Sequence, residues 1–428
     1  MRKNVLIFGG GSYTSCQIYF SLKDSLRFKP ILASSNDNHS TFICKDAITD
    51  LPYDSSPDFL DGINKCIEEY NIDFIIPTHD TAALRLMEKE EMIKASVVCS
   101  PLETARICRY KTLTYKALKG LGFLPKLYDL DDAGLEYPVF VKDDAGQGGR
   151  DAFLVKSRDD LIYIRPDLTY VACEYLPGQE ITIDCFTDRH GELRYIMPRS
   201  RERLLNGISA RARNLQLTEE LRSIVEGIAS RITFHGYWFV QCRQDQYGRY
   251  KLMEISTRFA GTFGLSKNLD VNLPLLALQD FSGQDIDILP NPYKITSDKI
   301  YIDRYKINYD YERVYIDFDD TLVFERKRYN TEAMRFLYQC INKGKKLVLI
   351  TKHAYNLKET AEKIRFDMGI FDDIIEVPED KPKYLYMDCD MPSIFIDNAF
   401  TERKEVKEHL GIPAFDVSNI EALIDWGD

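Results

Sequence analysis

The sequence of 428 residues predicts a three-part chain of the α/β class, and three observations lead to this prediction. The first and last parts alternate strand and helix patterns, which is typical of parallel sheets covered by helices. The middle part has many short strand patterns and few helix patterns, which is typical of an α+β unit. The length also exceeds that of one typical core. We therefore expect units at residues 1–105, 106–295 and 312–428, with a linker at 296–311.

Apolar runs that end in glycine or polar residues predict four strands in the first part. Helical periodicity lies between them, as at residues 58–70 and 81–95, and this alternation predicts a small parallel sheet with helices on both faces. The expected strands are residues 4–10, 29–35, 73–80 and 96–100.

The middle part opens with a helix pattern at residues 111–121, and a second helix pattern at 218–233 interrupts its strands. Residues 286–311 contain prolines and many tyrosines without helical periodicity, so we place a last strand and the linker there. The expected strands are residues 138–142, 151–155, 169–176, 181–186, 192–198, 238–243 and 250–256.

The last part returns to strand and helix alternation, which predicts a second parallel sheet. Helix patterns lie near residues 331–343, 357–366 and 401–410. The expected strands are residues 314–318, 345–351, 373–377, 393–397 and 414–418.

Composition excludes several classes of protein. Apolar residues make up 44% and charged residues 29%, as in ordinary folded proteins, and the net charge of −11 argues against a nucleic-acid partner. The sequence has no run of 18 apolar residues and no charged-then-apolar leader, so we expect a cytoplasmic protein with no membrane partner. The ten cysteines form no C-x-x-C pair, which favours buried free thiols over disulfides or zinc sites.

The stretch VYIDFDDTLV at residues 314–323 concentrates carboxylates at the end of a buried strand. Asp317, Asp319 and Asp320 come at the end of a run of apolar and aromatic residues, so they should lie where open α/β sheets bind ligands. Such a cluster costs several kcal/mol in repulsion and desolvation unless a cation compensates. The stretch therefore predicts a metal and a phosphate.

Three further residues at family-like spacing accompany this stretch: Thr351 at the end of LVLIT, Lys381, and Asp397 at the end of SIFID. Together with Asp-x-Asp-x-Thr they resemble the haloacid dehalogenase superfamily over residues 312–428. Only about 30 residues separate Asp317 from Thr351, and Thr351 from Lys381, which leaves no room for an inserted cap. The resemblance therefore implies a capless Rossmannoid domain of this superfamily.

The resemblance also implies roles. Asp317 would attack a phosphoryl group, and Asp319 would protonate the leaving oxygen and later activate water. Asp317, Asp397 and the main-chain carbonyl of Asp319 would hold Mg²⁺. Thr351 and Lys381 would neutralise the transferring oxygens, with Lys383 competing for the role of Lys381. A strand-end cap for Thr351 and a solvated Lys381 are the purely structural alternatives.

The first two parts resemble an ATP-grasp ligase of the carbamoyl-phosphate-synthase-like branch, with a Rossmann-like pre-ATP-grasp unit followed by an α+β ATP-grasp unit. Lys142 in YPVFVKDDAGQGGRD would point from a strand toward ATP phosphates, and the glycines after it would let main-chain amides close over them. A Glu-Tyr-Leu hinge would face adenine, and Glu180 would bind ribose. The positions implied for ATP are Lys111, Lys142, Gly146, Gly148, Gly149, Glu174, Tyr175, Leu176 and Glu180.

The same resemblance implies Gln241 and Glu254 as Mg²⁺ ligands and Arg258 as a phosphate contact. Ser256 stands where the family usually has asparagine, and its hydroxyl is a weaker metal ligand than an amide carbonyl. The arginines between residues 194 and 213 are expected to lie in or beside a mobile loop. Arg211 is the expected phosphate contact, and a solvated charged loop is the alternative.

The opening glycines, Gly9 to Gly11, invite comparison with a dinucleotide fingerprint, but residues 12–15 do not complete G-x-G-x-x-G. In the ATP-grasp resemblance this unit instead shapes the acceptor-substrate site.

The two resemblances together imply a bifunctional enzyme that uses ATP and Mg²⁺. One half would join small-molecule carboxylate and amine substrates through an acyl phosphate, and the other would hydrolyse a phosphorylated small molecule. A homo-oligomer is possible. One alternative is a phosphatase whose ATP-grasp half binds nucleotide as a sensor without ligating, and another is a non-enzymatic scaffold, against which the intact acidic cluster argues.

Overall fold

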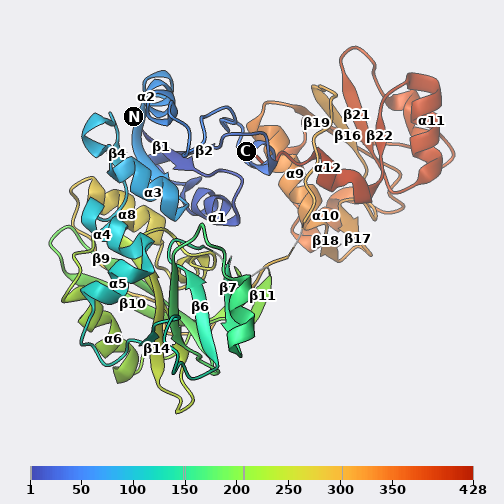
Figure 1. The fold of residues 1–428 in the computed structure, drawn as a ribbon. Coiled ribbons are helices and arrows are strands. Elements are labelled where there is room, and N and C mark those ends of the chain that lie inside the picture. The colour runs from blue at the N-terminus through green and yellow to red at the C-terminus, as the bar shows by residue number, and fades with distance from the viewer. Residues whose placement is uncertain (1, 148, 150, 206–207, 301, 428) are drawn as a thin grey trace. The chain divides into compact units, whose positions relative to one another are not determined.

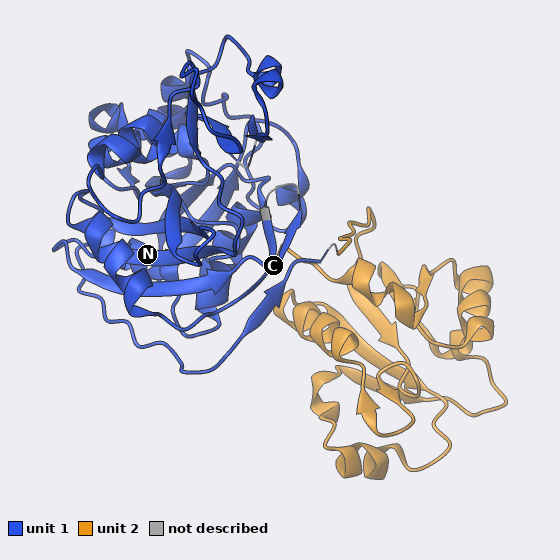
Figure 2. Cartoon of the chain, turned by 60° about the horizontal axis from the view of Figure 1, so that its bottom comes forward, with its two compact units in different colours: residues 1–301 blue, residues 302–428 orange. Residues whose placement is uncertain are grey.

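The chain folds into two compact units, residues 1–301 and 302–428 (Figure 2). Gly148, expected in the phosphate-binding loop, lies outside the residues described below. The computed structural model describes residues 2–147, 149, 151–205, 208–300 and 302–427.

A parallel sheet opens the first unit, as the sequence predicts (Figure 1). Its elements are β1 (Lys3–Phe8), α1 (Tyr13–Leu22), β2 (Phe28–Ala33), α2 (Phe59–Tyr70), β3 (Ile72–Pro77), α3 (Asp80–Met87) and β4 (Ser96–Val97). The strand order is β2-β1-β3-β4. Because β1 and β3 are parallel neighbours, the glycine turn after β1 and the start of α3 meet at the same edge of the sheet.

Two four-stranded antiparallel sheets form most of the rest of the first unit. The smaller has the order β5-β8-β6-β7, and the larger has the order β10-β9-β13-β14, on which helix α6 packs around the buried Trp238. The strands are β5 (Leu127–Tyr128), β6 (Val139–Asp143), β7 (Ala152–Val155), β8 (Tyr170–Glu174), β9 (Glu180–Thr187), β10 (Leu193–Ser200), β13 (Gly236–Gln244) and β14 (Tyr250–Ser256). The helices are α4 (Leu102–Arg109), α5 (Lys111–Ala117), α6 (Glu219–Ala229), α7 (Gly264–Lys267) and α8 (Leu273–Phe281).

The arginine-rich segment differs from the loop that the sequence predicts. It contains a hairpin of β11 (Arg203–Leu205) and β12 (Ile208–Arg213), which β15 (Thr296–Asp298) extends to three strands. β15 lies within residues 286–311, where the sequence predicts a last strand and the linker. Such pairing joins residues far apart in sequence, and local patterns carry no sign of it.

The second unit is built on a parallel sheet of order β20-β19-β16-β21-β22. Its elements are β16 (Arg313–Ile316), β17 (Val323–Phe324), β18 (Arg328–Tyr329), α9 (Thr331–Asn342), β19 (Lys346–Thr351), α10 (Leu357–Ile364), β20 (Asp373–Glu376), β21 (Ser393–Ile396), α11 (Phe400–Leu410), β22 (Ala414–Phe415) and α12 (Ile420–Leu423). Between β16 and β19 the chain forms the small β17–β18 hairpin and α9. The central position of β16 places its carboxyl end between those of β19 and β21.

None of the helices in the described residues is long and apolar enough to cross a membrane.

Candidate active sites

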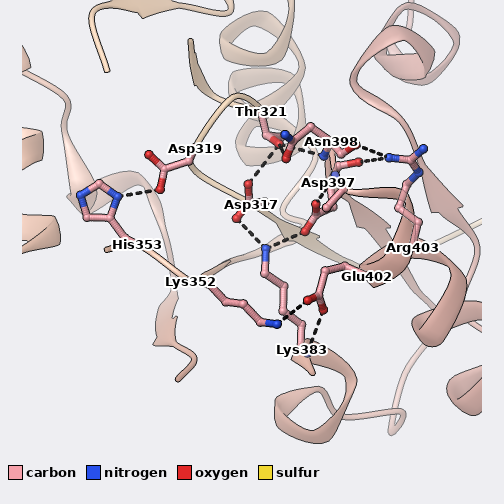
Figure 3. A network of polar contacts seen from close by, with 11 residues as sticks. Asp317, Asp319, Thr321, Lys352, His353, Lys383, Asp397, Asn398, Glu402 and Arg403 are labelled. Carbon is pink, nitrogen blue, oxygen red and sulfur yellow. Dashed lines mark hydrogen bonds and ion pairs between the residues drawn. The ribbon is translucent and has the colours of Figure 1, made fainter. Parts of the chain in front are cut away.

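Asp317 and Asp397 meet at the carboxyl edge of the second unit's sheet, where Lys383 joins them (Figure 3). The Lys383 Nζ lies 2.6 Å from Oδ1 of Asp317 and 2.6 Å from Oδ2 of Asp397. Asp317 follows β16 and Asp397 follows β21, and these parallel strands are neighbours. The strand topology therefore brings together two acids that are 80 residues apart in the sequence.

Short local contacts hold the two carboxylates. The hydroxyl of Thr321 donates to Oδ2 of Asp317 at 3.2 Å, and the amide of Ala399 donates to Oδ1 of Asp397 at 2.7 Å. The Asp317 amide donates to the Ile396 carbonyl, which continues the pairing of β16 with β21. The carboxylates are thus fixed by the first residues after each strand.

The cluster is buried and electrostatically strained. Asp317, Asp397 and Lys383 are 5%, 1% and 3% exposed, so one lysine serves two desolvated acids. Burial raises the pKa of Asp317 to about 6, and the Asp397 charge adds to this shift while Lys383 opposes it. Burial also raises the pKa of Asp397. A further cation would relieve this excess of negative charge.

The lysine of this site is Lys383, and the expectation of Lys381 is corrected. Lys381 lies in the exposed run before it, with its Nζ 3.6 Å from Asp380. Lys383 begins a short 3-10 helix, and its amide donates to Oε2 of Glu402 on α11 at 3.0 Å. The two lysines are two residues apart, and only the turn between them decides which one points inward.

Asp319 lies beside the cluster and is more exposed, with 35% of its side chain accessible. Its Oδ2 is 2.6 Å from Nδ1 of His353, a residue that the sequence motifs did not single out (Figure 3). Asp320 faces away and accepts the Glu325 amide at 3.0 Å, which stabilises the loop after β16.

Thr351 ends β19, the strand beside β16, and is 1% exposed. Its Oγ1 has no hydrogen-bond partner among the described residues. A buried hydroxyl left in this state costs about 1–3 kcal/mol. An oxygen-rich ligand would supply the missing partner, which argues against Thr351 being only a strand-end cap.

The donor set suits Mg²⁺. No group of three or more His, Cys, Asp or Glu side chains that could hold a metal is found in the described residues. Mg²⁺ is ordinarily held by one or two carboxylates, with waters and phosphate oxygens completing the octahedron. Asp317 and Asp397 provide this number, and the Asp319 carbonyl would be a further oxygen ligand.

The first unit has a second polar pocket, at which its parallel sheet and its antiparallel sheets meet. Helix α5 contributes Lys111 and strand β14 contributes Glu254, two residues that the sequence predicts for nucleotide and metal binding. The pocket is lined by Asp80, Lys111, Gly146, Glu254, Ser256 and Arg258, among others.

The two predicted phosphate lysines are buried beside this pocket. Lys111 Nζ donates to the carbonyls of Asp143 and Gly146, at 2.9 Å each, and so holds the glycine-rich loop. Lys142 Nζ donates to the Tyr115 hydroxyl at 3.1 Å and to the Met253 carbonyl at 3.2 Å. Both lysines are therefore placed and oriented by main-chain and neutral groups rather than by carboxylates.

Glu254 lines the pocket, and its side-chain carboxylate has no hydrogen bond or ion pair among the described residues. Burial lowers the pKa of Lys111, and the Glu254 charge opposes this shift. The two side chains therefore interact electrostatically. In register with Glu254, Gln241 on β13 donates its amide to Oε1 of Glu180 at 2.6 Å. Glu254 thus has its carboxylate available for Mg²⁺, whereas the Gln241 amide is engaged.

Ser256 and Arg258 are joined to the start of helix α3 through Asp80. The Ser256 hydroxyl donates to Oδ1 of Asp80, and Arg258 Nε donates to Oδ2 at 2.8 Å. Although burial opposes the effect, Arg258 and Ser256 hold the pKa of Asp80 below its usual range. Ser256 therefore acts here as a donor to a carboxylate, which disfavours it as a metal ligand.

The predicted hinge residues lie at the end of β8. Glu174 exchanges hydrogen bonds with Lys126, accepting the Lys126 amide at Oε1 and donating its own amide to the Lys126 carbonyl. Tyr175 is 37% exposed and Leu176 is buried. Glu180, expected at ribose, pairs with Arg201 Nε at 2.6 Å.

Arg211 does not reach the pocket, which corrects its expected phosphate role. Its guanidinium lies on the three-stranded sheet and donates to Asp298 at 2.8 Å, with about half of the side chain exposed. Arg199 is also paired, since its Nε lies 2.7 Å from Asp184 in the core. The arginines of this segment therefore mainly form ion pairs that stabilise the fold. Arg201 differs because its partner, Glu180, is a residue expected to bind ATP.

Comparison with known proteins concerns the first unit. Residues 167–300 match the family described as ATP-grasp in the biosynthetic pathway with Ter operon. None of the curated proteins matches the sequence.

Several solved structures share the fold. The biotin carboxylase domain of Hydrogenobacter thermophilus 2-oxoglutarate carboxylase, solved with MgADP and bicarbonate, is 17% identical with a TM-score of 0.58, over 69% of this chain and 74% of that one. N5-carboxyaminoimidazole synthetase from Staphylococcus aureus with ADP is 17% identical, with a TM-score of 0.56 over 68% and 80%. L-amino acid ligase from Bacillus licheniformis is 20% identical, with a TM-score of 0.53 over 65% and 74%.

The first unit therefore has the ATP-grasp fold, with a parallel sheet preceding it, as in these structures. The family match ends at residue 300, and it gives no support to the resemblance of the second unit to the haloacid dehalogenase superfamily. That resemblance depends on the strand order and the acidic site described above.

Proposed function

We propose that residues 1–301 form an ATP-dependent ligase that joins a carboxylate to an amine. The observation that carries this proposal is the unpaired Glu254 carboxylate in a pocket with Lys111 and Arg258, within the ATP-grasp fold. Glu254 would hold Mg²⁺ bound to ATP, and Mg²⁺ would neutralise phosphate charge there. The names of two similar structures, a synthetase and an amino acid ligase, agree with this class.

The reaction would proceed in two displacements. A carboxylate oxygen of the substrate attacks the γ-phosphorus of ATP, and the bond to the β–γ bridging oxygen breaks to release ADP. The amine nitrogen then attacks the carbonyl carbon of the acyl phosphate, and inorganic phosphate leaves as the amine loses a proton. Lys111, Lys142 and Arg258 would stabilise the phosphate oxygens throughout.

ADP release in the presence of pooled carboxylates and amines, followed by mass spectrometry of the product, tests this ligase. We expect Lys142→Met to abolish turnover and Lys116→Met, on the exposed side of α5, to retain it. If ATP binds but no carboxylate and amine pair is ligated, the alternative of a nucleotide-sensing half is favoured. The engagement of Ser256 by Asp80 is the observation that favours this alternative.

We also propose that residues 302–428 form a Mg²⁺-dependent phosphatase. The observation that carries this proposal is the Lys383 ammonium bridging Asp317 and Asp397, together with the unpartnered hydroxyl of Thr351 at the end of the neighbouring strand β19. Asp317 would attack phosphorus to form an aspartyl phosphate, and water would then hydrolyse this intermediate. Lys383 and Thr351 would hold the phosphoryl oxygens.

Hydrolysis of a panel of phosphate esters, with and without Mg²⁺, tests the phosphatase. Asp317→Asn should reduce the rate to background, because an amide is a poor nucleophile. Asp320→Asn is the matched control, since Asp320 lies in the same loop with its side chain directed to the Glu325 amide. Equal rates for wild type and Asp317→Asn across the panel would refute this function.

A further inference from the structure

His353 lies at the edge of the second unit's acidic site, two residues after Thr351 (Figure 3). Its side chain is 0% exposed, although its main chain reaches solvent. The imidazole Nδ1 is 2.6 Å from Oδ2 of Asp319, and Nε2 is 2.9 Å from Oγ1 of Thr360 on α10. The ring therefore bridges Asp319 to a helix of the domain.

The hydrogen-bond directions fix the ring. The Thr360 hydroxyl donates its single proton to the Asn356 carbonyl at 3.0 Å, so it accepts from Nε2 of His353. Nδ1 is then directed at Oδ2 of Asp319. Phe318 packs edge-on against the imidazole at 5.6 Å between ring centroids, which blocks rotation.

We propose that His353 is the positioning residue for Asp319, holding its carboxyl group in the orientation needed to protonate the leaving oxygen. This inference rests on the proposed phosphatase function. Asp319 is the least buried acid of the site, so it has freedom to rotate that Asp317 and Asp397 lack. The short hydrogen bond from a buried, clamped imidazole removes this freedom.

Both chemical steps of the proposed reaction depend on the orientation of the Asp319 carboxyl group. As the bond from Asp317 to phosphorus forms, the bond from phosphorus to the ester oxygen breaks, and Asp319 gives its proton to that oxygen. In the second step Asp319 takes a proton from water as the water oxygen bonds to phosphorus, which releases inorganic phosphate and regenerates Asp317. Both steps need one Asp319 oxygen directed at the reacting group.

The effect of His353 substitutions on kcat for different leaving groups distinguishes a positioning role of His353 from a purely structural one. An alkyl oxygen leaves only with a proton, whereas para-nitrophenolate leaves as a stable anion and needs general acid catalysis much less. In the full-length protein, His353→Ala should lower kcat for glycerol phosphate by about 100-fold and kcat for para-nitrophenyl phosphate by only about 3-fold. KM should change little, because His353 does not contact the phosphate oxygens.

Two isosteric variants refine the test. The amide nitrogen of asparagine replaces Nδ1, so His353→Asn should restore most of the glycerol phosphate activity. The amide of glutamine replaces Nε2, so His353→Gln should remain impaired even though it fills more of the site. Thermal unfolding of each variant identifies any that do not fold, and His353→Asn then provides the comparison.

Equal losses on the two substrates in His353→Ala, or rescue by glutamine but not by asparagine, would overturn the inference. If Asp317→Asn abolishes hydrolysis while all His353 variants keep wild-type rates, the phosphatase stands and only the role of His353 falls. If the wild type hydrolyses neither substrate in Mg²⁺ faster than Asp317→Asn does, both the proposed phosphatase and this inference fail.

Discussion

At the residue scale, the second unit's site is governed by an imbalance of charge. Asp317 and Asp397 are both nearly inaccessible and share one lysine, so the site carries excess negative charge before any ligand arrives. A buried ion cluster of this kind is weak support for stability, because desolvation offsets most of the attraction. The arrangement is better explained by what it can bind.

Substitutions of Lys383 and of Lys381 should have clearly different effects on activity and stability. Lys383→Met leaves two buried carboxylates without their shared cation, so we expect at least a 100-fold loss of phosphatase rate and a loss of about 3 kcal/mol in the free energy of unfolding. Lys381→Met, two residues away and exposed, should change neither. Phosphate ester kinetics and urea denaturation measure the two effects, and similar behaviour of both variants would contradict the assignment of Lys383.

The raised pKa of Asp317 predicts a pH dependence of stability in metal-free protein. Its pKa rises from about 4 in the unfolded chain to about 6 in the fold, chiefly through burial, so the native state binds the proton more tightly. The stabilisation from this proton is full below about pH 4 and is lost as pH rises through about 6. Asp317→Asn mimics the protonated acid at every pH.

The unfolding free energy of Asp317→Asn minus that of wild type should therefore increase between about pH 4 and pH 6 and then level off. Chemical denaturation with a chelator present measures it. A flat difference over this range would show that the pKa of Asp317 is the same in the folded and unfolded states, and addition of Mg²⁺ should reduce the difference above pH 6 because Mg²⁺ binds the carboxylate.

At the scale of elements, parallel strands explain why part of the site could be predicted from sequence. Asp317, Thr351 and Asp397 each follow an apolar run, and the central place of β16 brings their strand ends together. The choice of Lys383 over Lys381, the contact of His353 with Asp319 and the pairing of β12 with β15 could not be predicted in this way. They depend on turn geometry or on pairing across about 90 residues, which no local period encodes.

Removal of the strand-end hydroxyl of Thr351 should preserve or increase stability and decrease activity. Thr351→Val keeps the shape of the side chain and removes a buried oxygen without a partner, so the free energy of unfolding should stay constant or rise by about 1–2 kcal/mol. Phosphatase kcat/KM should fall about 10-fold or more as a phosphoryl contact is lost. Thr351→Ser, which retains the hydroxyl, is the control, and destabilisation by valine would indicate an undetected partner such as a bound water.

At the scale of the whole molecule, one chain carries two units with separate polar sites. The ATP-grasp pocket draws its residues from α5, β14 and the start of α3, and the acidic site draws its own from β16, β19 and β21. Among the described residues, no side chain belongs to both sites. A substitution in one site should therefore leave the chemistry of the other intact, unless the two share an intermediate.

Reciprocal variants of the full-length protein can measure this independence. Asp317→Asn should leave the rate of ADP release unchanged, because Glu254, Lys111 and Arg258 are untouched, while any phosphate carried by the ligated product remains attached. Glu254→Gln should abolish ADP release and leave hydrolysis of phosphate esters at the wild-type rate. Mass spectrometry distinguishes the products by the mass of one phosphate group.

The same variants also determine the order of the two reactions. A product that still carries phosphate in Asp317→Asn and lacks it in wild type would place ligation first. Loss of ADP release in Asp317→Asn, restored by dephosphorylated substrate, would place the phosphatase first and contradict the independence of the two sites.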